Sequence, residues 1–198
     1  SANNLTLTNN IFDGLPNPYI RIYDSFSGTL DAHNNTFENA EDSTLGAIRI
    51  SAGANLSGAK FENNSFINVP FAVQNLAASN LDTSPNWWGS IKGPASGTIS
   101  GTVTYDPWCG DAACSFLVSG TEPGESGIFV QNGNLVIKGQ VNVPGGIELN
   151  EPGLTVVLKD GAVVHNTSPC FIVNADNVTI LRNDWRRQVR ADRRRKRY

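Results

Sequence analysis

Short stretches in which apolar and polar residues alternate recur along the first half of the chain. Three gapless copies share the pattern Asn-Asn-x-Phe, and a degenerate copy ends in Asn-Trp-Trp. The copies cover residues 5–12, 30–37, 59–66 and 81–88. Alternation over four to five residues is strand periodicity, so each copy predicts a short β-strand that runs into a bend. Between the copies, a second short strand is expected at residues 19–22, 47–50 and 71–73.

The spacing of the copies indicates how they are stacked. The second asparagine falls at positions 10, 35, 64 and 86, so successive copies lie 25, 29 and 22 residues apart. One copy cannot bury its apolar face alone, whereas stacked copies can, and a repeat of this length favours a parallel β-solenoid. Leu5, Leu7 and Phe12, with their equivalents, are expected to point inward. The repeated asparagine is expected at a bend, where identical side chains can hydrogen-bond from coil to coil.

The Asn-Asn-x-Phe coils resemble the repeats of right-handed parallel β-helix proteins, the pectate-lyase-like superfamily. The segment 86–108, with Asn86-Trp87-Trp88-Gly89 and Asp106-Pro107-Trp108, resembles the part that closes such domains in many secreted prokaryotic proteins. The resemblance implies an all-β fold in which residues 1–108 are the terminal coils of a right-handed parallel β-helix. It implies no activity, because the same coils occur in lyases, hydrolases, epimerases, adhesins and stalks. The paired-Asp, Gly-His-Gly and Arg-Ile-Lys signatures of polygalacturonase-like hydrolases are missing from the sequence.

The second half of the chain has a different pattern. Residues 109–127 are rich in turn formers and are predicted to be a linker. Strand patterns resume in residues 128–181, where Leu154-Thr155-Val156 matches Val178-Thr179-Ile180 at a step of 24 residues. This region is therefore expected to start a second, partial β-helical or β-rich unit.

Charge is distributed very unevenly along the chain. Residues 182–198 hold nine Lys and Arg against two Asp, a net charge of +7, whereas residues 1–181 hold six bases against 16 acids, a net charge of −10. Because the basic tail interrupts the solenoid in mid-repeat, we expect it to be foreign to the fold. Alternatives are a nucleic-acid-binding arm that neutralises phosphates, or a short helix across the open solenoid end. Nucleic acid is therefore expected as a partner only through this tail.

Composition narrows the class of protein further. Charged residues make up 17% of the chain, while Asn occurs 23 times and Gly 19 times, which favours tight turns and short strands. No apolar run approaches the roughly 20 residues of a membrane helix, so no membrane partner is expected.

One set of outward-facing residues has the composition of a catalytic site. The strand alternation places Thr6, Asp31 and Lys60 in one column and Thr8, His33 and Glu62 in the next. Carboxylates can serve as acid and base on a glycosidic bond, and a base with carboxylate-bound calcium can drive β-elimination of a uronate. The alternative is a solvated face on which Asp31 lies beside Lys60 and His33 beside Glu62. No cofactor is expected otherwise, and no zinc-ligand spacing is present.

A second set of residues could bind a sugar without taking part in a reaction. Arg21 and Arg49 occupy equivalent positions of the second strand and could hold an anionic sugar, although Ala72 is expected to end their column. Trp87, Trp88 and Trp108 could form a sugar-stacking platform, or they could cap the last coil.

The three cysteines point to an oxidising environment. Cys109 and Cys114 lie close together in a loop and could form a local disulfide, which fits a secreted protein. Cys170 lies on an apolar strand, so a buried free thiol is expected there.

These observations favour a piece of a secreted or cell-surface protein that acts as a structural and carbohydrate-binding module with a polysaccharide or glycan partner. The second hypothesis is a polysaccharide lyase or glycoside hydrolase that uses Asp31, His33, Lys60 and Glu62.

Overall fold

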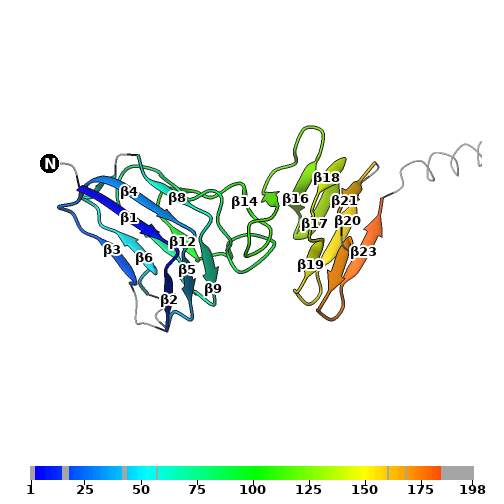
Figure 1. Ribbon diagram of the computed structural model, residues 1–198, viewed down its shortest axis with the longest axis horizontal. Coiled ribbons are helices and arrows are strands. Elements are labelled where there is room, and N and C mark those ends of the chain that lie inside the picture. Colours follow the sequence, from blue (N-terminus) through cyan, green and yellow to red (C-terminus); the bar gives the residue numbers. More distant parts are fainter. Residues whose placement is uncertain are drawn as a thin grey trace, which may run out of the picture. The chain divides into compact units, whose positions relative to one another are not determined.

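The computed structural model describes residues 3–14, 18–41, 44–56, 58–159, 161–167 and 169–183. This described part is all-β and contains no helix, and its stacked parallel strands form a β-solenoid of about seven turns (Figure 1). The predicted fold class is thereby confirmed. The chain divides into two compact units, Ser1–Val118 and Ser119–Tyr198.

Three parallel sheets run along the first unit, and each of the first three coils contributes to all of them. The first sheet contains β1 (Asn3–Thr8), β4 (Ser27–His33), β7 (Asn55–Leu56) and β8 (Lys60–Glu62). The second contains β2 (Ile11–Asp13), β5 (Thr36–Glu38) and β9 (Ser65–Ile67). The third contains β3 (Ile20–Ile22), β6 (Ile48–Ile50), β10 (Val73–Asn75) and β12 (Ile99–Ser100). In addition, β11 (Leu81–Asp82) pairs in parallel with β13 (Val103–Thr104).

The aromatic position of the repeat forms the centre of the core. Phe12 stacks on Phe37 at 4.9 Å between ring centroids, Phe37 stacks on Phe66 at 5.1 Å, and Phe66 stacks on Trp88 at 4.9 Å. Phe37 and Phe66 are almost fully buried. The degenerate fourth copy therefore belongs to the same stack, and its tryptophan replaces the phenylalanine of the earlier coils.

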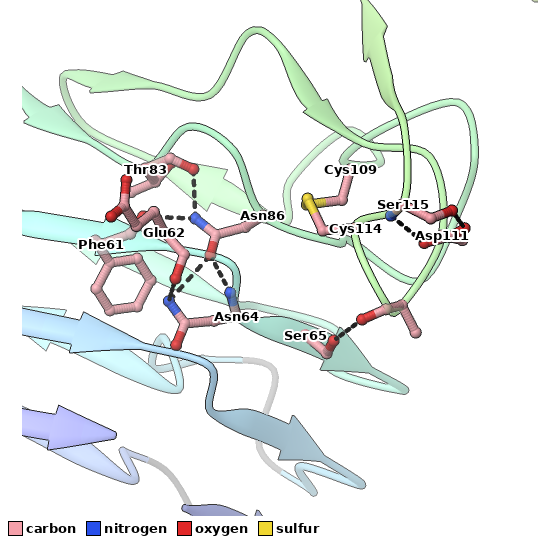
Figure 2. The surroundings of a disulfide bond; sticks show 11 residues. Phe61, Glu62, Asn64, Ser65, Thr83, Asn86, Cys109, Asp111, Cys114 and Ser115 are labelled. Atoms are coloured by element: carbon pink, nitrogen blue, oxygen red, sulfur yellow. Dashed lines mark hydrogen bonds between the residues drawn. A yellow bond between two sulfur atoms is a disulfide. The ribbon is translucent and has the colours of Figure 1, made fainter. Parts of the chain in front are cut away.

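The segment predicted to be a linker is partly folded into the first unit. β14 (Trp108–Cys109) pairs in antiparallel fashion with β15 (Leu117–Ser119), and a disulfide joins Cys109 to Cys114 in the loop between them (Figure 2). The indole of Trp108 is buried and donates a hydrogen bond to the carbonyl of Ile91 at 3.0 Å. The boundary between the units lies at Val118, inside the predicted linker of residues 109–127.

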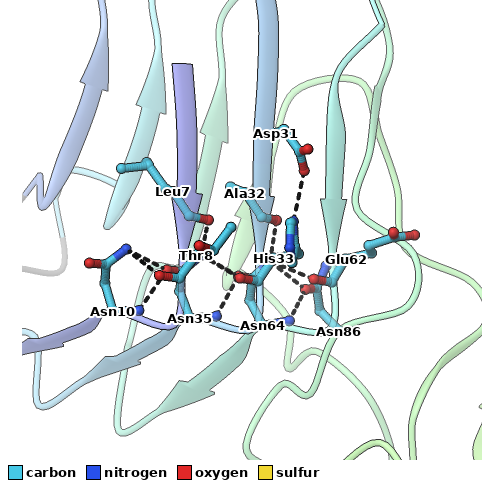
Figure 3. Close-up of polar contacts among 10 residues, drawn as sticks. All are labelled: Leu7, Thr8, Asn10, Asp31, Ala32, His33, Asn35, Glu62, Asn64 and Asn86. Atoms are coloured by element: carbon cyan, nitrogen blue, oxygen red, sulfur yellow. Dashed lines mark hydrogen bonds and ion pairs between the residues drawn. The ribbon is translucent and has the colours of Figure 1, made fainter. Parts of the chain in front are cut away.

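The repeated asparagines form the predicted ladder along the bend between the first and second sheets (Figure 3). The side-chain amide of Asn10 donates to Asn35 Oδ1 at 3.0 Å, Asn35 donates to Asn64 at 2.9 Å, and Asn64 donates to Asn86 at 3.0 Å. The same three Oδ1 atoms also accept the backbone N–H of the preceding ladder residue. Each bend is thus bonded to the next coil through both side chain and backbone.

The first asparagine of each pair has a different role. Asn9, Asn34 and Asn63 have φ values of 57°, 58° and 56°, in the left-handed region that asparagine tolerates better than most residues. This conformation turns the chain from the first sheet into the second. The Asn-Asn pair therefore combines one residue that makes the bend with one that bonds it to its neighbour.

The strand register corrects one detail of the alignment. Arg21 pairs with Arg49 as expected, but Arg49 pairs with Gln74, and Gln74 pairs with Ser100. The prediction that Ala72 ends this column was wrong, because the third strand lies two residues further along the chain. The column stays polar over four coils.

The second unit begins with a hairpin and continues as coils. β16 (Gly127–Gln131) pairs with β17 (Asn134–Lys138) in antiparallel fashion, and β17, β20 (Thr155–Leu158) and β23 (Thr179–Arg182) then stack in parallel. Two further parallel pairs complete the coils: β18 (Gln140–Asn142) with β21 (Val163–His165), and β19 (Ile147–Leu149) with β22 (Phe171–Val173). Thr155 pairs with Thr179, which is the predicted step of 24 residues. Beyond Arg182 and Asn183, the predicted basic tail lies outside the described residues.

Candidate functional site

The predicted catalytic residues lie together on the first sheet and are called the acid–base face here. The register pairs Asp31 with Lys60 and His33 with Glu62, as the alternation predicted. Within β4, His33 Nδ1 lies 2.8 Å from Asp31 Oδ1, and these side chains are 35% and 40% exposed (Figure 3). The contact of His33 is therefore with the carboxylate two residues earlier in its own strand.

The Asp31–His33 contact has a chemical consequence. The carboxylate fixes the orientation of the imidazole ring and favours a proton on Nδ1. The other ring nitrogen, Nε2, is then the atom that can accept or donate a proton at the surface of the sheet. Glu62, partly exposed on the neighbouring strand, supplies a second carboxylate in the adjacent register position.

A basic face lies on the third sheet and is defined by Arg21, Tyr23, Arg49 and Gln74. The guanidinium of Arg21 lies 4.7 Å from the ring centroid of Tyr23, a cation–π distance, and Tyr23 is 59% exposed. Arg49 Nε and Gln74 Oε1 are buried and have no hydrogen-bond partner within the described ranges. This face combines an exposed aromatic ring with positive charge on one sheet.

Sequence reasoning missed two of these four residues. Tyr23 follows Arg21 at a spacing of two, so the same alternation that placed the arginines could have placed it on their side. Gln74 was missed because the third strand of the repeat was aligned two residues too early.

Of the tryptophans predicted to form a platform, only Trp87 is partly exposed. Trp88 is 6% exposed and stacks on Phe66, so its ring faces the core rather than a ligand. Trp87 is partly exposed, and its backbone bonds to Asn64 and Phe66 in the preceding coil. The structure thus places Trp88 in the stack that closes the coils.

A polar recess of about 460 Å³ lies at the bend beside the disulfide loop. Its lining comes from two successive bends and from the loop itself: Asn34, Asn35, Thr36, Asn63, Ser65, Ala112, Ala113 and Cys114. The hydroxyl of Ser65 donates to the carbonyl of Ala112 at 3.2 Å, which holds the loop against the second sheet (Figure 2). Sequence reasoning did not find the recess, because it treated the loop as a linker.

Cys170 differs from its prediction. It is a free thiol, but it is exposed rather than buried. Its sulfur lies 3.4 Å from Asn166 Oδ1. Phe171 and Ile172, which follow Cys170, are only partly buried and Val173 is exposed, so the apolar pattern overstated the burial of this strand.

Comparisons with known proteins were negative: no protein-family model, curated protein or solved structure matches this chain. Among the described residues, no three His, Cys, Asp or Glu side chains gather closely enough to hold a metal ion. The same part of the chain includes no helix with the length and apolar character needed to span a membrane.

Proposed function

We propose that this chain is a carbohydrate-binding module of a secreted or cell-surface protein, and that its basic face binds an acidic polysaccharide. The observation that carries the proposal is the exposed ring of Tyr23 beside the guanidinium of Arg21, on a sheet where Arg49 occupies the next coil. The Asn-Asn-x-Phe repeats, which resemble those of the pectate-lyase-like superfamily, agree with such a role.

Each group on this face has a counterpart in an acidic sugar. A guanidinium binds a carboxylate through two parallel hydrogen bonds, and the ring of Tyr23 can stack on the apolar side of a sugar. Neighbouring parallel strands are about 4.8 Å apart, so equivalent side chains form an evenly spaced row. A polymer of repeating sugar units presents its carboxylates in a similar row.

The disulfide supports the proposed location. Disulfides such as that between Cys109 and Cys114 persist in oxidising compartments and are rare in reducing ones.

The test is binding to a uronate-rich polysaccharide, with a neutral polysaccharide as the comparison, by calorimetry at two salt concentrations. A charge-assisted hydrogen bond contributes about 1.5–3 kcal/mol, so Arg21→Ala should weaken binding roughly 10- to 150-fold. Arg21→Lys should restore only part of the loss, because an ammonium group cannot bind a carboxylate in the bidentate geometry. Lys60→Ala, which removes a positive charge from the acid–base face, is the matched control and should bind normally. Equal affinity of Arg21→Ala and the parent chain for the acidic polymer would refute this proposal.

A second candidate function is favoured by the 2.8 Å contact between Asp31 and His33. An imidazole oriented by a carboxylate is a suitable general base or acid, so this face could act as a polysaccharide lyase or glycoside hydrolase, with Glu62 and Lys60 as the other charged groups. If the reaction is a lyase reaction, calcium is the expected ion; Asp31 and Glu62 would supply only two carboxylates, so the uronate groups of the substrate would have to supply further oxygen ligands.

Release of reducing ends and of unsaturated uronates, measured with and without calcium, separates the two functions. Activity that is lost in His33→Gln and Glu62→Gln but retained in Arg21→Ala would establish the enzyme. Binding without any release would leave the module as a binding protein.

A further inference from the structure

We propose that Asn34 and Asn63 form a paired acceptor site for one N-linked oligosaccharide. Both stand in the sequon Asn-x-Ser/Thr, as Asn34-Asn35-Thr36 and Asn63-Asn64-Ser65. The proposal rests on the secreted location proposed above, because N-linked oligosaccharides are added to secreted and surface proteins.

In the second and third repeats, the structure separates the two asparagines into one that can be modified and one that cannot. Asn35 and Asn64 are each 1% exposed, and their side-chain amides are used in the ladder. Neither stands in a sequon. By contrast, Asn34 and Asn63 are exposed at the bend, with positive φ values that direct the chain around the corner.

The surroundings of the two acceptors leave room for a sugar. Asn34 and Asn63 both line the recess of about 460 Å³, together with the hydroxyl-bearing residues Thr36 and Ser65 of their own sequons. The recess is bounded on another side by the disulfide loop at Ala112. Its polar lining can hydrogen-bond the hydroxyls of the first sugar.

The reaction needs a co-reactant of a defined class, an oligosaccharide linked through a diphosphate to a polyprenyl lipid. The side-chain Nδ2 of the acceptor asparagine attacks C1 of the sugar. A new C1–N bond forms, the C1–O bond to the diphosphate breaks, the lipid diphosphate leaves with the bonding electrons, and one proton leaves Nδ2. No oxidation or reduction is involved.

The solenoid geometry predicts that only one of the two acceptors is occupied in any one molecule. Thr36 pairs with Ser65, so the two sequons lie on adjacent coils, about 4.8 Å apart at the strand spacing. Two branched oligosaccharides cannot leave neighbouring side chains at that distance without severe crowding. Because this bend joins the first and second sheets, the oligosaccharide would leave the basic face on the third sheet free.

The test is secretion of the full chain from a eukaryotic cell line, followed by intact mass and peptide mapping with and without an N-glycosidase. Asn177, an exposed asparagine in the sequon Asn177-Val178-Thr179, serves as the internal reference. We expect one oligosaccharide on the Asn34/Asn63 pair in each molecule. We also expect Asn34→Gln to transfer all of that occupancy to Asn63, and the double variant to lose one oligosaccharide mass.

A second pair of variants avoids strain at the bend. Thr36→Val and Ser65→Ala destroy the sequons while leaving Asn34 and Asn63 in place, and the double variant should lose the same single oligosaccharide. Two oligosaccharides on the pair in one molecule would overturn the paired-site proposal. Absence of any oligosaccharide from both Asn34 and Asn63 would also overturn the proposal, whether or not Asn177 is modified. Polysaccharide binding by the basic face is measured separately on unmodified protein, so failure of one proposal leaves the other standing.

Discussion

The asparagine ladder makes an unusually specific prediction about stability, because one side chain in it has five hydrogen-bonding partners. The two hydrogens of Asn64 Nδ2 are shared among three acceptors: Asn86 Oδ1 at 3.0 Å, the Ala32 carbonyl at 3.0 Å and the Glu62 carbonyl at 3.2 Å. Its Oδ1 accepts both the backbone N–H and the side-chain amide of Asn35, at 3.0 and 2.9 Å. Asn64 is 1% exposed, so water does not replace these partners readily.

The cost of Asn64→Ala follows from these contacts. The side chain can make four hydrogen bonds at once, so a net contribution of about 1 kcal/mol for each gives about 4 kcal/mol, and local relaxation reduces this to about 3 kcal/mol. A domain is stable by about 5–15 kcal/mol in total, so the variant should lose a large part of its stability. Asn10→Ala is the matched control. Its side chain is exposed and donates to Asn35 Oδ1 and the Thr8 carbonyl, so its loss should cost about 1 kcal/mol.

The assay is urea unfolding followed by tryptophan fluorescence, since Trp88 and Trp108 are buried in the first unit and report its unfolding. The midpoint for Asn64→Ala should fall much further than that for Asn10→Ala, with a similar dependence on urea concentration. If both variants lose the same small amount of stability, the ladder does not stabilise the solenoid in the way argued here.

Three further predictions concern the core, the loop and the second unit. Phe66→Ala should lower the free energy of unfolding, measured in urea, by about 3–5 kcal/mol, because Phe66 is buried between two stacked rings. Phe12→Ala, at the first coil, should lower it by less. Equal losses in the two variants would contradict the stacking argument. Replacing both Cys109 and Cys114 by serine should lower the free energy of unfolding by about 2 kcal/mol, as the chain-entropy model gives for a short closed loop. A thermal unfolding midpoint equal to that of the parent chain would contradict this prediction. Hydrogen bonds from Lys159, and to a smaller extent from Lys138, hold the pKa of Glu122 below its ordinary value of 4.5. The ionised carboxylate therefore stabilises the fold at pH values above 4.5. This stabilisation is lost as the pH falls through the lowered pKa. Acid titration of Glu122→Gln, followed by circular dichroism, should therefore show a smaller loss of stability in this range than the parent chain, and identical curves would refute the pairing.

The parts of the fold that could be predicted from sequence are those in which the repeat has no gaps. The positions of Asn10, Asn35 and Asn64 fixed the ladder, and the alternation around them placed Asp31 beside Lys60 in the correct register. The third strand of each coil was harder to align, because the loops before it differ in length between coils. That is why Gln74 was missed as the neighbour of Arg49.

The details of the candidate sites depend on side-chain conformations, which the periodicity of the sequence does not determine. Alternation places His33 and Glu62 side by side, but it cannot show that the imidazole contacts Asp31 instead. It also cannot distinguish a tryptophan that stacks in the core, such as Trp88, from one that stacks on a ligand. Both distinctions depend on rotamers and on neighbours that are distant in the sequence.

The ladder also has a consequence for how the chain can change by gene duplication. Successive ladder residues are separated by 25, 29 and 22 positions, yet their hydrogen bonds are nearly the same length. Differences in coil length are therefore absorbed in the loops, and each ladder residue contacts only the coils directly beside it. After an in-frame duplication or deletion of one whole coil, for example residues 36–64, each ladder asparagine would still hydrogen-bond to an asparagine on the next coil. Homologous chains should therefore differ by whole coils or by loop insertions, and insertions should be rare at the Asn-Asn bend itself.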